Sequence, residues 1–370
     1  MKGRAVLFIG ARKPFELTEY EVPEPEPGAI VLKVTQAGIC GSDLHSWRGD
    51  GTPAPVPAGG RTTGHEGTGV VYKLGIGVST DSLGKPIKEG DRLMYSAIAP
   101  CGRCYQCLNG QGNWCVQGFF PRRTPGEYPY FNGTYADYYY IRSDQPVFRV
   151  PDELPDSVLG FVNCAMGTVT EGLMRAGCKE GDYVVIQGAG GLGLNAVAAA
   201  KDMGAHRVVV LDRLENRLAL AREFGADDTI NIEHEWTTPE MRRQRVMELT
   251  DNRGADIVLE LVGRSELLVE GLSYLTNGGT FVEIGNIVRG NPVPFDPSQL
   301  VFSAKQIIGS PMYRPRLLPM MLETLVKQQG KVPYEKIVSH TFPLEKINEA
   351  FEQAEWLDRQ PAITRSMLVP

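Results

Sequence analysis

The stretch YVVIQGAGGLGLNAVAAAKDMGAHRVVVLD, residues 183–212, decides one half of the fold. YVVIQ is a short apolar run typical of a buried strand, and the GAGGLG after it sets Gly188, Gly190 and Gly193 in G-x-G-x-x-G register. Small residues then predict a helix, and HRVVVLD predicts a second buried strand that ends at Asp212. Strand, glycine loop, helix and strand in this order predict a dinucleotide-binding βαβ unit.

The glycines and the acidic residue of this unit each have a chemical purpose. The first glycine makes a tight turn, the second lets backbone approach a pyrophosphate, and the third lets helix pack close to strand. The pyrophosphate then lies on the positive end of the helix. Asp212, 19 residues after Gly193, is expected to accept both ribose hydroxyls of the adenosine, which favours NAD(H) over NADP(H). Arg213 and Arg217 keep NADP(H) open, because either side chain is able to face a phosphate. A glycine-rich turn without a ligand is the remaining alternative.

The alternation of strand and helix continues beyond residue 212. Further strands are expected at DTINI, DIVLELVG and TFVEIG, and helices are expected at 214–224, 239–250 and 265–276. This spacing predicts a parallel, doubly wound sheet. The region before residue 150 differs, since it has short strand candidates, many Gly and Pro residues and a cysteine cluster. The chain is therefore expected to be an α/β protein of two unlike domains.

Composition limits the classes of partner and compartment. The 370 residues carry a net charge of −6 and no basic block, which argues against nucleic acid as a partner. No run of 18 apolar residues occurs, so a membrane span is not expected. The N-terminal residues have no signal-peptide pattern, and the seven cysteines are an odd number. We therefore expect a cytoplasmic protein, in which clustered cysteines indicate a metal more often than a disulfide.

Four cysteines lie in CGRCYQCLNGQGNWC, residues 101–115, with the spacing C-x2-C-x2-C-x7-C. The members of this set are Cys101, Cys104, Cys107 and Cys115. Close cysteine pairs of this kind aim thiolates at one point, and four thiolates complete the tetrahedron that Zn²⁺ prefers. A closed ligand set of this kind is structural. An iron–sulfur cluster also takes four cysteines, but its usual spacings differ.

A second metal site has to be assembled from distant residues. Cys40, His65 and Cys164 would supply two thiolates and an imidazole, the three-ligand set of a catalytic zinc with one exchangeable position. Glu66, next to the histidine, is a candidate ligand or a carboxylate beside the metal. The alternative is that each cysteine is a small residue of the core, because ligands scattered over 125 residues have no regular spacing. Cys178 fits no ligand pattern and is expected in the core.

With these motifs assembled, the sequence resembles the zinc-dependent medium-chain dehydrogenase/reductase family of alcohol and polyol dehydrogenases. The motifs that carry the resemblance appear in the family's order: GICGSDLH, GHEGTG, the four-cysteine segment, GAGGLG and PLEKINEAFE. The resemblance implies a GroES-like, β-rich catalytic domain made of 1–165 and 310–370, with a Rossmann NAD-binding domain at 166–309. It also implies two zinc ions per chain and a homodimer or homotetramer.

The family pattern further implies roles around the metal. Cys40, His65 and Cys164 would bind the catalytic zinc, Glu66 would act beside it, and Asp43 would orient His65.

Four more residues match family roles in proton transfer and cofactor binding. Ser42 matches the hydroxyl that takes the alcohol proton, and His45 matches the histidine that passes the proton to solvent. Thr168 matches a nicotinamide contact, and Arg365 matches a pyrophosphate contact.

The expected function is reversible hydride transfer between NAD(H) and an alcohol or ketone. A secondary, cyclic or aromatic alcohol is favoured, because the aromatic stretch 119–131 and Trp47 are candidates for pocket walls. The stretch 119–131 is alternatively packing of the four-cysteine lobe or an oligomer contact. Polyol-type and threonine-type dehydrogenases of the same family remain alternatives, as does a non-catalytic nucleotide-binding relative.

Overall fold

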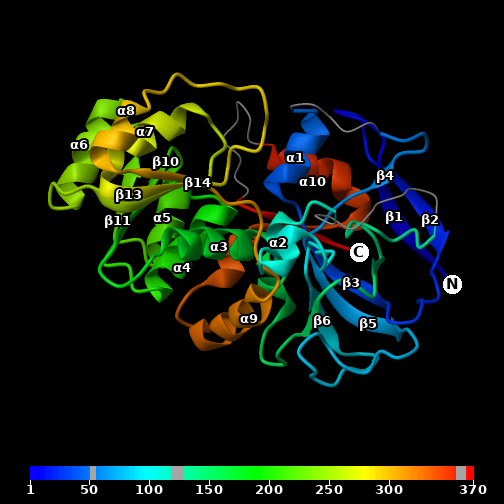
Figure 1. The fold of residues 1–370 in the computed structure, drawn as a ribbon. Coiled ribbons are helices and arrows are strands. Elements are labelled where there is room, and N and C mark those ends of the chain that lie inside the picture. The colour runs from blue at the N-terminus through cyan, green and yellow to red at the C-terminus, as the bar shows by residue number, and fades with distance from the viewer. Residues whose placement is uncertain (51–55, 118–127, 356–363) are drawn as a thin grey trace. The chain divides into compact units, whose positions relative to one another are not determined.

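A computed structural model describes residues 1–50, 56–117, 128–355 and 364–370 of the chain (Figure 1). The chain divides into two compact units. The first contains 1–167, 314–329 and 334–370, and the second contains 168–313 and 330–333. The expected domain ranges differ from these units mainly at 310–313 and 330–333, which belong to the second unit. No described helix has both the length and the apolar character that a membrane span requires.

The second unit is built on a six-stranded parallel sheet in the order β11-β10-β9-β12-β13-β14. Its strands are β9 Tyr183–Gln187, β10 Arg207–Asp212, β11 Asp228–Asn231, β12 Ala255–Glu260, β13 Leu275–Glu283 and β14 Gln306–Gly309. The strand order reverses between β9 and β12, so their carboxyl ends form the switch point at which doubly wound sheets bind ligands. The predicted doubly wound α/β architecture is confirmed.

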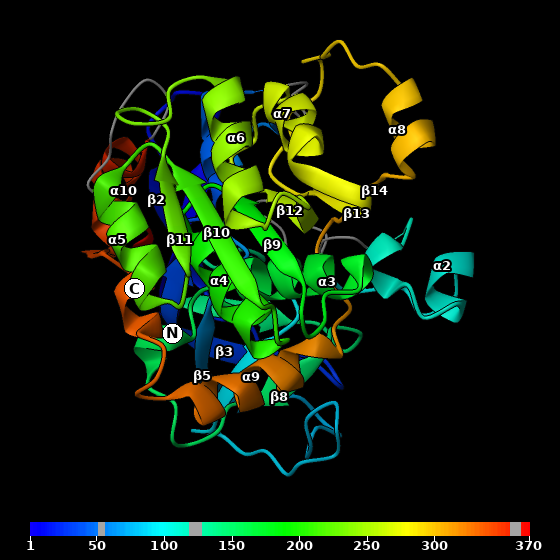
Figure 2. The ribbon, with the colours of Figure 1, turned by 90° about the vertical axis from the view of Figure 1, so that its left-hand side faces the viewer.

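Helices cover both faces of this sheet (Figure 2). The helices of the unit are α3 Gly167–Ala176, α4 Gly191–Asp202, α5 Glu215–Glu223, α6 Pro239–Leu249, α7 Glu266–Tyr274 and α8 Ser298–Ser303. Helices α4 and α5 pack on one face, whereas α6 and α7 pack together on the other. All five residues of β9 are buried, as expected of a strand covered on both faces. The expected helices at 214–224, 239–250 and 265–276 correspond to α5, α6 and α7.

The first unit is rich in short, mostly antiparallel strands, which fits the expected GroES-like domain. Its strands are β1 Lys2–Phe8, β2 Glu16–Glu21, β3 Ile30–Gly38, β4 Arg61–Thr62, β5 Thr68–Leu74, β6 Arg92–Tyr95, β7 Tyr138–Ile141, β8 Val147–Arg149, β15 His340–Pro343 and β16 Ser366–Val369. One sheet has the order β2-β1-β4; the other has the order β15-β16-β3-β5-β6-β8, with β7 paired to β3. Because β16 pairs with β3, the last described strand of the chain completes a sheet that begins near its N-terminus.

The first unit also contains helices among its described residues. They are α1 Gly41–Arg48, α2 Tyr105–Leu108, α9 Leu317–Gln328 and α10 Ile347–Ala354. The buried core includes Val6, Leu32, Tyr135 and Phe351. Figure 1 shows α1 beside α10, whose ends are joined by a buried ion pair between Arg48 and Glu355 at 2.7 Å.

Candidate metal centres and cofactor site

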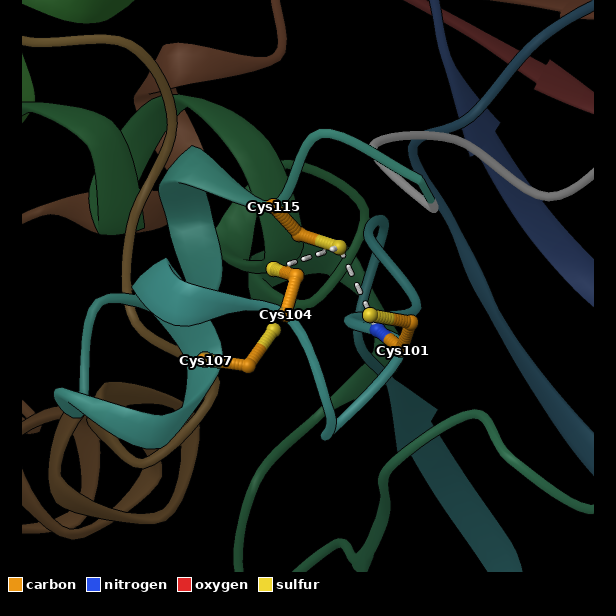
Figure 3. Close-up of side chains that lie close together, drawn as sticks. All are labelled: Cys101, Cys104, Cys107 and Cys115. Atoms are coloured by element: carbon orange, nitrogen blue, oxygen red, sulfur yellow. Dashed lines mark hydrogen bonds between the residues drawn. The ribbon is translucent and has the colours of Figure 1, made fainter.

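The four clustered cysteines converge on one point in a lobe around α2 (Figure 3). Their sulfur atoms all lie within 4.8 Å of one another, and the Sγ atoms of Cys104 and Cys115 are 3.9 Å apart. A zinc ion bound by four thiolates at about 2.3 Å places neighbouring sulfurs about 3.8 Å apart in a regular tetrahedron. The donor set and its convergence therefore fit a zinc ion.

The surroundings of these four cysteines favour the thiolate at some positions and the neutral thiol at others. The backbone N–H of Cys107 is the largest influence that lowers the pKa of Cys104 to about 6. Burial and the neighbouring thiols raise the pKa of Cys107 to about 12. Four adjacent thiols therefore do not all ionise by themselves, and a dication at their centre removes this conflict.

The second cysteine set also converges, although its members are distant in the sequence. Cys40 caps α1, His65 and Glu66 lie between β4 and β5, and Cys164 lies in the π-helical segment Val162–Met166. One ligand atom from each lies within 4.8 Å of the others. The Sγ atoms of Cys40 and Cys164 are 3.9 Å apart, and Cys164 Sγ is 3.4 Å from His65 Nε2. A tetrahedral zinc site predicts about 3.8 and 3.6 Å for these two pairs, so the donors fit the ion.

A buried carboxylate, that of Asp43, fixes two of these residues. Its Oδ2 accepts a hydrogen bond from the backbone N–H of Cys40 at 3.0 Å, and its Oδ1 lies 3.6 Å from His65 Nδ1. Burial lowers the pKa of His65, but Asp43 and Cys40 outweigh it and hold that pKa well above the usual value. The two distances show that His65 turns Nε2 towards Cys164 and Nδ1 towards Asp43, the orientation that the family resemblance implied for a ligand.

Glu66 is fully buried and pairs with Arg365. The guanidinium donates to Glu66 Oε2, whereas Oε1 has no hydrogen-bond partner among the described residues. Burial raises the pKa of Glu66 to about 7, and the charge of Arg365 opposes that rise. The structure thus places Arg365 against the candidate metal site, a contact that the sequence did not predict. Its role as a pyrophosphate contact stays a prediction.

The two candidate proton carriers lie on α1, three residues apart and thus on the same side of the helix. Ser42 is in its first turn. The Nδ1 of His45 lies 2.8 Å from Asp50 Oδ2 and 2.9 Å from Arg48 Nη2. Burial lowers the pKa of His45, while the hydrogen bond with Asp50 raises it. Burial thus favours the neutral imidazole of His45, which is the form able to accept a proton.

The candidate pocket walls are not confirmed. The Trp47 ring packs edge-on against Phe351 at 6.1 Å and belongs to the rim of the core. Most of the aromatic stretch 119–131 lies outside the described residues. Its end packs against a core cluster, because Phe131 is fully buried and the Tyr130 ring stacks on Tyr20 at 5.0 Å. Cys178 is half-buried.

The glycine loop of the second unit has the geometry that a pyrophosphate requires. Gly188 has a φ of +104°, which favours glycine, and a Cβ at Gly193 would lie 2.0 Å from the carbonyl oxygen of Gly188. A Cβ at Gly190 would meet no atom within 4 Å, so the N-terminus of α4 is open where a phosphate would bind.

Asp212 ends β10 and is buried beside that loop. It accepts hydrogen bonds from the backbone N–H of Ala189 at 2.7 Å and of Leu214 at 2.9 Å. The carboxylate therefore anchors the glycine loop and retains acceptor capacity for ribose hydroxyls. Arg217 is half-buried nearby, and burial lowers its pKa while Asp212 raises it. Thr168 is a buried residue at the start of α3.

Two family models match this chain. A family model described as an alcohol dehydrogenase GroES-like domain matches residues 26–152, and one described as a zinc-binding dehydrogenase matches 191–327. The 5-exo-hydroxycamphor dehydrogenase of Pseudomonas putida is 33% identical over 90% of this chain and 91% of its own length. This chain belongs to the zinc-dependent medium-chain dehydrogenase/reductase family.

Other members of the family match over most or all of their length. The L-threonine 3-dehydrogenase of Anaeromyxobacter sp. (strain K) is 30% identical over 90% of both chains. The crystal structure of an alcohol dehydrogenase from Thermotoga maritima superposes with a TM-score of 0.90 at 30% identity and covers 100% of both chains. The protein is therefore an oxidoreductase of the dehydrogenase class, with the GroES-like and Rossmann folds of its family.

Three functional candidates of this dehydrogenase escaped the sequence analysis. Arg48 and Asp50 contact His45, and Tyr135 contacts Asp43. Arg48 and Asp50 stand three and five residues after His45, so their closeness in the sequence was the one signal that could have indicated them. Tyr135 stands 92 residues from Asp43 and had no such pattern.

Proposed function

We propose that this dehydrogenase is a zinc-dependent alcohol dehydrogenase that transfers hydride between NAD(H) and a secondary, cyclic or aromatic alcohol. The observation that supports the proposal most strongly is the largely buried group of Cys40, His65 and Cys164, whose spacings match three ligands of one tetrahedral zinc. The proposal includes a second zinc held by the four-cysteine lobe, and hence two ions per chain.

The chain's own residues supply binding, orientation and proton transfer. At such a site zinc supplies Lewis acidity, which favours the deprotonated form of an alcohol, and the nicotinamide accepts the hydride. Ser42 would take the proton of the alcohol hydroxyl, and His45 would carry it onward from the same helix. Glu66, paired with Arg365, would balance the charge beside the ligands.

The cofactor preference rests on Asp212. Its buried carboxylate stands at the end of β10, so a 2′-phosphate on the adenosine ribose would meet a like charge. Thr168, Arg213, Arg217 and Arg365 are retained as proposed cofactor contacts. We expect Asp212→Asn to raise the ratio of kcat/KM with NADP⁺ to that with NAD⁺ by about tenfold, because it removes this repulsion. An unchanged ratio would place the ribose contact elsewhere.

The substrate class is supported by one relative. The Pseudomonas putida enzyme is named for 5-exo-hydroxycamphor, a ring alcohol, which favours a cyclic substrate. The threonine 3-dehydrogenase is the specific reason to keep an amino-alcohol substrate as a second candidate.

The test is a panel of linear, cyclic, aromatic and polyhydroxy alcohols and L-threonine with NAD⁺ and with NADP⁺. Reduction of the nicotinamide is followed on zinc-loaded protein and on chelator-treated protein. Turnover with NAD⁺ that is lost with the zinc is expected. Full turnover after removal of the zinc would contradict the proposal, and no turnover with both zinc and NAD⁺ bound would favour a non-catalytic relative.

A cytoplasmic location and a homodimer or homotetramer complete the proposal. Thiol ligands have to stay reduced before the metal binds, which suits a reducing compartment. Gel filtration with light scattering tests the oligomer.

A further inference from the structure

Tyr135 is a buried residue of the first unit and lies in the segment that leads into β7. Its side chain is 1% exposed, and its hydroxyl donates to Asp43 Oδ2 at 2.7 Å. The carbonyl oxygen of Gly38 is 3.3 Å away and is the weaker acceptor. A tyrosine hydroxyl donates one proton, and the shorter contact to a charged oxygen takes it.

The position of this tyrosine is held by its backbone and its ring. Its N–H donates to the carbonyl of Thr63 at 3.2 Å, and its carbonyl accepts from the N–H of Val6 at 2.9 Å. Its ring packs edge-on against Phe351 with a centroid distance of 6.0 Å. The first of these contacts ties it to the segment that leads into His65. The hydroxyl is therefore a fixed donor rather than a mobile one.

Asp43 connects this donor to two proposed zinc ligands. Its Oδ2 receives both the Tyr135 hydroxyl and the N–H of Cys40, while its Oδ1 faces Nδ1 of His65. The rotation of the Asp43 carboxyl group is thus set by two donors on one oxygen, and that rotation decides where the other oxygen points.

We propose that Tyr135 is a positioning residue of the metal site: its hydroxyl holds the Asp43 carboxylate in the rotation that orients His65 and Cys40. The inference rests on the proposed function, because it presupposes that these two residues bind zinc. A buried tyrosine also needs a partner for its hydroxyl whatever its role, so the alternative is that the contact serves stability alone.

A matched variant distinguishes the two readings. Tyr140 is likewise buried, at 3% exposed, and lies five residues further along the chain. Its hydroxyl lies 3.0 Å from the N–H of Glu26, from which it accepts, and 3.2 Å from the hydroxyl of Tyr128. Neither of these two partners is a proposed zinc ligand or Asp43. Tyr135→Phe and Tyr140→Phe therefore delete the same atom from two buried rings, and only the first removes a donor to Asp43.

The experiment measures zinc affinity by competition with a chromophoric chelator and records the visible absorption spectrum of the Co²⁺-substituted protein. Cys164→Ser lacks one proposed ligand, so the zinc ion that this variant loses is the one that belongs to this site. We expect Tyr135→Phe to weaken zinc binding at this site by about 10- to 100-fold, the usual effect of losing a group that orients a ligand. We also expect its Co²⁺ spectrum to change, and both quantities to stay within about twofold of wild type in Tyr140→Phe.

Two results would overturn the inference. If both variants lower the melting temperature but leave zinc affinity and the Co²⁺ spectrum unchanged, Tyr135 serves stability alone while the proposed function stands. If wild type and Cys164→Ser bind the same amount of zinc, the proposed function fails and the inference fails with it.

Discussion

The two cysteine sites of this dehydrogenase use similar donors in opposite surroundings. The lobe takes all four sulfurs from fifteen consecutive residues, and Cys115 Sγ accepts from the backbone N–H groups of Cys101 and Gln117. The other site joins Cys40 to Cys164, 124 residues apart, and is flanked by buried charges. The proposal of one structural and one catalytic zinc accounts for this difference, because local thiolates complete a closed site, whereas orienting charges are needed where a metal also has to take part in a reaction.

The largest effect is expected at the buried site. Cys164→Ser removes one of its three proposed ligands, and kcat/KM should fall by roughly 10³-fold or more, since a Lewis acid contributes several kcal/mol. Zinc content should fall by one ion per chain, measured by atomic emission, while the lobe keeps its own. Persistent turnover at full zinc content would show that this cysteine is not a ligand.

The matched change in the lobe should affect stability instead. Cys104→Ser should release the other zinc ion and lower the free energy of unfolding by roughly 4 kcal/mol, because a metal site that holds a loop is lost. Denaturant titration and limited proteolysis between residues 101 and 117 measure this effect. If Cys104→Ser kept the stability of wild type but lost dehydrogenase activity, the lobe would be the catalytic site and the buried site the structural one.

A smaller effect is expected when one of the charges around the buried site is removed. Asp43→Asn keeps the size of the side chain but removes the charge that faces His65, so zinc affinity at this site should fall by about 10- to 100-fold. The affinity of the lobe should not change, and chelator competition on the same sample gives both values. An equal loss at both sites would point to general unfolding.

The smallest effect concerns the proposed proton carrier beside the buried site. Asp50 raises the pKa of His45, so Asp50→Asn should lower that pKa further. The acid limb of kcat/KM against pH for alcohol oxidation should then move to lower pH, because His45 accepts a proton only when it is neutral. If the acid limb of the profile does not move, it reports the titration of a group other than His45.

Much of the fold was predictable because its causes are local. Each strand from β9 to β13 was expected from a short run of apolar residues, and β9 to β12 differ from the expected stretches by a few residues at most. The glycine register was equally readable, since the need for Gly188 and Gly193 arises within one turn of chain. The four-cysteine lobe follows from spacing alone for the same reason.

The buried site was predicted in part, and by resemblance rather than by spacing. Cys40, His65, Glu66 and Cys164 do converge as expected. The ion pair of Glu66 with Arg365 and the position of Trp47 against Phe351 were not foreseen. Both contacts join residues about 300 positions apart, and no periodicity records such a pairing.

The sequence by itself determined the order of the elements, the dinucleotide loop and the closed cysteine set, because each depends on interactions between residues near one another in the chain. Only the tertiary structure decided which charges surround the buried site. Strand β16 pairs with β3 and sets Arg365 against Glu66, and the backbone of Tyr135 joins β1 to the segment before His65. The physical reason is that a buried charge needs a partner, and folding selects that partner by position in space rather than by distance along the chain.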